Sequence, residues 1–158
     1  LLDLHLSHGA MALNIIPDRN WNVEDPADRE RKVANLGAVV ECAKLRGMPV
    51  FVGTEMNAPG QPDVDNFDAP AMRPLAETFV RGARAACAHT WAERQGGMGY
   101  ASVWAETHLP DLNARRDFFE AAAFRYADEY ASTPPRKEMS PAEFAKLSAL
   151  QNGQTVAR

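Results

Sequence analysis

The chain has 158 residues, of which 46% are hydrophobic and 24% are charged, a balance typical of an ordinary globular domain. Its net charge of −4 argues against a general nucleic-acid surface, because such a surface needs a basic stripe to neutralise phosphates. Every apolar run is shorter than the roughly 20 residues of a membrane span, so we expect a cytoplasmic protein without nucleic-acid or membrane partners. Cys42 and Cys87 lie in apolar surroundings and are expected to be buried, reduced thiols.

The first part of the chain alternates strand-like and helix-like segments. An apolar run at residues 10–16 predicts a first strand, and a β-branched and aromatic run at 49–52 predicts a second. Between them, Asp25 and Pro26 suit the N-cap and first position of a helix, whose apolar residues recur at steps of three and four up to Gly47. This order predicts two parallel strands joined by a helical crossover.

A long loop is predicted after the second strand. Residues 58–70 are rich in proline, glycine, aspartate and asparagine, which is typical of a loop that covers a site or lies on the surface. Asp63, Asp65 and Asp68 alternate in this loop, but they lack the glycine and closing glutamate of a calcium loop. We therefore expect solvated turn residues.

The second half begins with a helix predicted over residues 73–81. A run of small residues at 85–88 then predicts a third strand, for which a helix through 87–93 is the alternative. Further short helices should follow. A linker is expected at 131–139, and a terminal helix with its tail at 140–158.

A polar side chain follows each of the three predicted strands. Asp18 comes after the first strand, Glu55 after the second and His89 after the third. Parallel α/β sheets carry their chemistry outside the carboxyl ends of their strands. We therefore expect these three side chains to gather at one edge of the sheet.

Three short motifs resemble those of the PHP superfamily, the polymerase and histidinol phosphatase proteins. Residues 9–20 (GAMALNIIPDRN) resemble its helix–strand–TDHN motif, residues 46–55 (RGMPVFVGTE) a strand ending in G-x-E, and residues 88–90 (AHT) an A-H-P strand end. The resemblance covers residues 1 to 95. It implies an α/β fold, a partial parallel (β/α) barrel over residues 1–130 with extra C-terminal helices. Because the chain opens with leucine inside an apparent helix, the N-terminal part of the same barrel is expected to precede it.

The same resemblance implies a metal-dependent hydrolase, with zinc or manganese as cofactor and a small phosphorylated substrate. It makes Glu55 and His89 metal ligands, and Asp18 a catalytic residue together with Arg19. Arg19 stands where the family has a ligating histidine, and a guanidinium cannot ligate a metal.

The substrate-binding residues implied by the resemblance surround this position. They are Arg19, Asn20, Thr54 and Asn57. The fork of Arg19 could bind the substrate phosphate. The alternative is a surface arginine paired with Asp18 or Glu24.

Two other functions stay open. The sequence lacks the family's first H-x-H motif and its final D-x-H motif, which favours a non-catalytic module that binds a ligand or partner through the same edge. The third alternative is an unrelated α/β barrel enzyme in which Glu55 is a general base.

Overall fold

The computed structural model describes residues 1–57, 59–123, 140 and 142. The chain divides into two compact units, Leu1–Arg81 and Gly82–Arg158, and each is described by itself. The predicted linker at 131–139 lies outside the described residues, as does nearly all of the predicted terminal helix and tail at 140–158.

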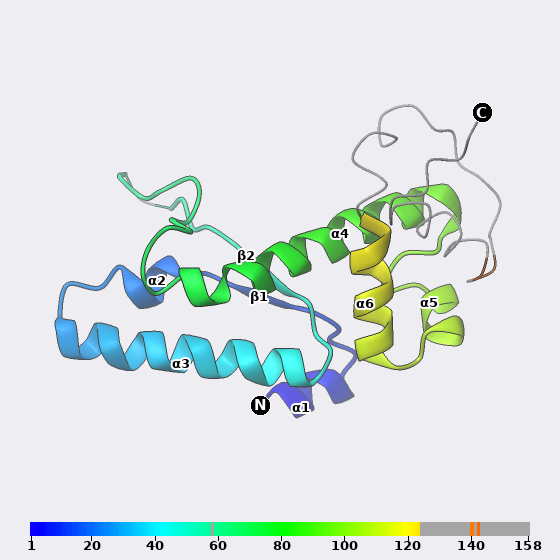
Figure 1. Ribbon diagram of the computed structural model, residues 1–158, viewed down its shortest axis with the longest axis horizontal. Coiled ribbons are helices and arrows are strands. Elements are labelled where there is room, and N and C mark those ends of the chain that lie inside the picture. Colours follow the sequence, from blue (N-terminus) through cyan, green and yellow to red (C-terminus); the bar gives the residue numbers. More distant parts are fainter. Residues whose placement is uncertain (58, 124–139, 141, 143–158) are drawn as a thin grey trace. The chain divides into compact units, whose positions relative to one another are not determined.

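The first unit is built on a sheet of two parallel strands, β1 (Leu13–Ile15) and β2 (Val50–Val52) (Figure 1). Leu13 lies opposite Val50 and Ile15 opposite Val52. The Leu13 N–H donates to the Pro49 carbonyl at 2.9 Å, and the Gly53 N–H donates to the Ile15 carbonyl at 2.7 Å. The predicted parallel pairing is confirmed.

Helix α3 (Pro26–Leu45) connects the two strands, and its ends follow from the sequence. The Asp25 carboxylate caps its start by accepting a hydrogen bond from the Asp28 N–H at 2.7 Å. Gly47 ends the helix in a left-handed conformation with φ of 71°. The Met48 N–H then donates to the Ala43 carbonyl at 3.0 Å, which closes the turn and leads directly into β2.

The core of the first unit lies between α3, the strands and the segment that leads into α4 (Ala76–Gly96). A 3₁₀ turn, η1 (Arg73–Leu75), precedes that helix. The buried residues are Leu36, Val40, Ala43, Met48, Val50, Ala69, Met72, Leu75 and Phe79. Burial of these side chains is the main force that holds the strand pair against the helices, because two strands alone are marginally stable.

Two short helices complete the first unit. Helix α1 (Leu2–Ser7) is joined to the end of α3 by an ion pair between Asp3 and Arg46, at 2.6 Å. The hydrogen bond from the Arg46 guanidinium lowers the pKa of the Asp3 carboxyl. Helix α2 (Asp18–Trp21) follows β1 directly.

The second unit is entirely helical in its described part. It contains the later turns of α4, then α5 (Val103–His108) and α6 (Leu112–Ala123). The third strand predicted at residues 85–88 is wrong, since this segment lies inside α4. Alanine has the highest helix propensity, and the alanines of this stretch form one buried stripe on the helix. The members of the stripe are Ala85, Ala88 and Ala92.

The predicted partial (β/α) barrel with extra C-terminal helices is therefore wrong. The described residues form a mostly helical chain with one open sheet of two strands, and no barrel is evident in them. A barrel needs successive strand–helix units, and the segment that should have supplied the third strand is helical. The prediction of buried thiols is also wrong, because Cys42 and Cys87 both lie exposed on helices. Across the described ranges, none of the helices is long and apolar enough to cross a bilayer.

A tight turn after α4 is held by two side chains of that helix. His89 Nδ1 accepts a hydrogen bond from the Tyr100 N–H at 2.9 Å, and Glu93 Oε2 accepts one from the Gly99 N–H at 3.0 Å. A Cβ at Gly99 would lie 2.5 Å from Glu93 Oε2 and 2.6 Å from His89 Nδ1. Glycine is therefore required if both hydrogen bonds are to form.

We expect Gly99→Ala to lower the free energy of unfolding by about 1–2 kcal/mol, because His89 and Glu93 must move away and lose these hydrogen bonds. The control is Gly37→Ala on α3, where the added methyl meets open space within the described residues. That change should stabilise the chain by about 0.5–1 kcal/mol. Urea unfolding of both variants measures the difference, and equal stabilities would contradict the packing of this turn.

Tyr100 is buried in the second unit, and this burial raises its pKa from 10.0 to about 12, although the Arg115 charge acts in the opposite direction. Because the folded pKa exceeds the unfolded one, this group contributes stability below pH 10 that is lost as the pH rises towards 12. An ultraviolet pH titration should show one late tyrosinate step that is missing in Tyr100→Phe. A step near pH 10 that Tyr100→Phe removes would contradict the burial.

Candidate functional site

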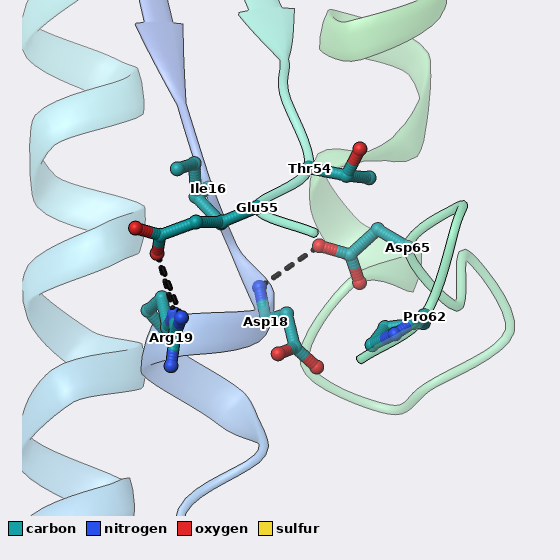
Figure 2. A pocket seen from close by; sticks show the side chains of 7 residues that line it. All are labelled: Ile16, Asp18, Arg19, Thr54, Glu55, Pro62 and Asp65. Atoms are coloured by element: carbon teal, nitrogen blue, oxygen red, sulfur yellow. Dashed lines mark hydrogen bonds and ion pairs between the residues drawn. The ribbon is translucent and has the colours of Figure 1, made fainter. Parts of the chain in front are cut away.

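A small open pocket lies at the carboxyl ends of β1 and β2 (Figure 2). We call it the edge pocket. It is lined by Ile16, Asp18, Arg19, Thr54, Glu55, Pro62 and Asp65. Parallel strands end at the same edge of a sheet, so the residues that follow β1 and β2 meet there, together with the loop after β2.

Arg19 and Glu55 form an ion pair across the edge pocket. Arg19 Nε donates to Glu55 Oε2 at 2.9 Å, and Arg19 Nη2 lies 2.8 Å from the same oxygen. The side chains are 48% and 39% exposed, so the pair contributes at most about 1 kcal/mol to stability. The sequence suggested Asp18 or Glu24 as partners of Arg19; the partner is instead Glu55, which the strand register brings close.

The second oxygen of Glu55 is also engaged. Asn57 Nδ2 donates to Glu55 Oε1 at 2.8 Å, and the Asn57 N–H donates to the Gln61 side-chain oxygen at 2.8 Å. Glu55 therefore holds Arg19 on one side and Asn57 on the other. Both partners were predicted to bind substrate; Arg19 lines the pocket, whereas Asn57 is not among its lining residues.

Asp65 was expected to be a solvated turn residue, and this prediction is wrong. It is buried, at 4% exposure, and its carboxylate accepts a hydrogen bond from the Asp18 N–H at 2.9 Å (Figure 2). It also accepts one from Trp21 Nε1 at 2.8 Å. It thereby fixes the loop after β2 to helix α2. The indole N–H of a tryptophan such as Trp21 usually has an acceptor, but nothing in the sequence spacing distinguishes Asp65 from Asp63 or Asp68 as that acceptor.

Of the other predicted residues in the first unit, some line the pocket and one does not. Thr54 lines it, and so does Asp18, whose Oδ1 accepts a hydrogen bond from Asn22 Nδ2 at 3.0 Å. Asn20 is not among the lining residues. Its amide turns back and donates to the Ile16 carbonyl at 3.2 Å, so it stabilises the turn from β1 into α2.

His89 lies on α4 in the second unit, where it binds the Tyr100 N–H, and Glu55 lies in the first. That His89 and Glu55 bind the same metal stays a prediction. Within the part of the chain that the structure describes, no group of three or more His, Cys, Asp and Glu side chains is arranged to hold a metal. Both oxygens of Glu55 and both of Asp65 accept hydrogen bonds from protein groups. These residues, as arranged, do not fit a zinc or manganese site.

Arg19 is the cationic residue that lines the edge pocket, and three acidic residues line it as well: Asp18, Glu55 and Asp65. Its Nε and Nη2 edge faces Glu55, whereas Nη1 makes no hydrogen bond to any of the described residues. A guanidinium can bind a second oxyanion through its remaining edge. The pocket can therefore bind one anionic group at Arg19.

Comparison of the chain with protein-family models, with curated proteins and with solved structures gives no match. The resemblance to the PHP superfamily thus rests on three sequence motifs and stays a prediction.

The role of Asp65 can be tested against that of its neighbour Asp63, which is exposed in the same loop. Asp65→Ala leaves the Asp18 N–H and the Trp21 indole N–H without their acceptor, so we expect a loss of about 2–4 kcal/mol in the free energy of unfolding. Asp63→Ala should change it by less than about 0.5 kcal/mol. Urea unfolding followed by tryptophan fluorescence gives both values; a small effect of Asp65→Ala would show that the loop is not held in this way.

Proposed function

We propose that the edge pocket binds a small phosphorylated ligand and that Arg19 is its anchor. The observation that supports this proposal is the way in which the Arg19 guanidinium is hydrogen-bonded. One edge is held by Glu55 at 2.8–2.9 Å, and the other edge is available at the carboxyl end of the strand pair.

Glu55 prepares Arg19 for binding because it fixes the plane of the guanidinium before a ligand arrives. A flexible arginine loses rotamer entropy when it binds, whereas a held one has already lost it. The phosphoryl group would accept hydrogen bonds from Nη1 and Nη2 in the bidentate geometry that arginine favours. Thr54 lines the same pocket, and its hydroxyl offers a further polar group to the rest of the ligand.

The carboxylates limit the affinity and the class of ligand. Asp18, Glu55 and Asp65 repel an anion that Arg19 attracts, so a ligand with a single phosphate should bind modestly. A nucleic-acid backbone, with a charge at each step, should be rejected. The proposal is thus a small phosphorylated molecule with uncharged polar groups.

Phosphoester hydrolysis is a second candidate function, and the position of Asp18 favours it. Asp18 lines the same pocket as Arg19, and its carboxylate could take a proton from a water that attacks phosphorus and pass it to the ester oxygen, which leaves as the alcohol when the P–O bond breaks. The resemblance implies that zinc or manganese takes part. The ligand set found among the described residues does not fit that metal, so we assign no step to it.

Calorimetric titration of the full 158-residue chain with inorganic phosphate tests the binding proposal. We expect Arg19→Ala to weaken binding about 10- to 100-fold, since it removes charge-assisted hydrogen bonds. Arg19→Lys should fall between wild type and Arg19→Ala, because it keeps the charge but loses the fork. The control is Arg31→Ala, which removes an exposed arginine paired with Asp28 on α3 and should leave binding unchanged.

Equal affinities of wild type and Arg19→Ala would overturn the proposal, as would an absence of phosphate binding. Hydrolysis is decided separately by phosphate release from p-nitrophenyl phosphate, with and without added zinc or manganese. Release by wild type that is abolished in Asp18→Asn supports the second candidate. No release under either condition leaves binding as the function.

A further inference from the structure

We infer that Asn14 extends the edge pocket and binds a hydroxyl of the ligand, which makes the ligand a phosphorylated polyol or sugar. This inference rests on the proposed function, since it takes Arg19 as the phosphate anchor. It concerns the part of the ligand that lies away from the phosphoryl group.

The alternation of the strands places Asn14 on the same side as the pocket. Leu13 and Ile15 pack against the core, whereas Asn14 between them is exposed. Side chains two residues apart in a strand share a face, so Asn14 lies in line with Ile16, which lines the edge pocket. On the neighbouring strand, Gly53 stands two residues before Glu55 in the same manner.

Gly53 leaves the space that the Asn14 amide occupies. A Cβ at Gly53 would lie 2.8 Å from Asn14 Nδ2 and 3.0 Å from its Oδ1, so any other residue would push this amide away. The amide therefore lies directly against the backbone at the end of β2, one residue before Thr54. Thr54 and Glu55 themselves line the pocket.

The Asn14 amide makes no hydrogen bond to any residue that the structure describes. Asparagine is also disfavoured in strands, yet it occupies the middle of a strand of three residues. Such a departure from local propensity is expected at functional or strained sites. We therefore assign this amide to ligand binding.

The chemistry of the amide selects the group that it would bind. Asparagine presents both a donor and an acceptor, which together match a hydroxyl or a pair of neighbouring hydroxyls. A hydroxyl carries no charge, so the carboxylates of the pocket do not repel it. With a phosphoryl group on Arg19, such a ligand is a phosphorylated polyol or sugar.

Two probes separate this inference from the proposed function: inorganic phosphate and glucose 6-phosphate, titrated into the full chain. Wild type should bind glucose 6-phosphate more tightly than phosphate. Asn14→Ala should weaken binding of the sugar phosphate by about five- to tenfold, the loss expected for one or two neutral hydrogen bonds, and leave phosphate affinity unchanged. Asn14→Val, which has a better strand propensity, should behave in the same way.

The control is Asn35→Ala, which removes an exposed asparagine from α3 and should affect neither probe. If phosphate binds through Arg19 but both Asn14 variants keep the full preference for the sugar phosphate, the inference fails and the proposed function stands. If the wild type binds both probes with equal affinity, the inference likewise fails and the proposed function stands. If phosphate does not bind at all, the proposed function fails and this inference fails with it.

Discussion

The parallel pairing of β1 with β2 is the constraint on which the first unit depends. Asp25 starts α3 and Gly47 ends it, so the helix returns the chain to the same end of the sheet and sets Leu13 opposite Val50. This register brings the residues after both strands to one edge. Arg19 and Glu55, 36 positions apart in the sequence, come within hydrogen-bonding distance as a consequence.

The edge pocket is held by two carboxylates that act in different ways. Asp65 is buried and accepts hydrogen bonds from two donors, so its removal should lower the free energy of unfolding. The same hydrogen bonds order the loop against α2. Glu55 is partly exposed and its ion pair adds little stability, but it fixes the direction of the guanidinium. Asp65 thus supports the pocket, while Glu55 holds one edge of the Arg19 guanidinium and leaves the other edge to a ligand.

The sequence predicted the first unit well where local signals agree. The cap at Asp25, the stop at Gly47 and the β-branched run before Gly53 each reflect backbone chemistry that can be read from neighbouring residues. The prediction of a strand at 85–88 failed because a short apolar run is compatible with a buried strand as well as a buried helix. Alanine favours the helix, and the buried stripe along α4 follows helical spacing. Asp65 was missed because its partners lie 44 and 47 positions away. The ion pair of Arg19 with Glu55 depends in the same way on the strand register.

The central claim is that Glu55 holds one edge of the Arg19 guanidinium while the other edge is available to an anion. Nuclear magnetic resonance of the Arg19 Nε–H, assigned with Arg19→Lys, tests it most directly. In the wild type, we expect this resonance to be shifted downfield and protected from solvent exchange. Glu55→Gln should return its shift towards that of an exposed arginine. Saturation with phosphate should leave the Nε–H resonance in place and shift the Nη protons. An Nε–H that exchanges freely in the wild type and ignores both Glu55→Gln and phosphate would contradict the account.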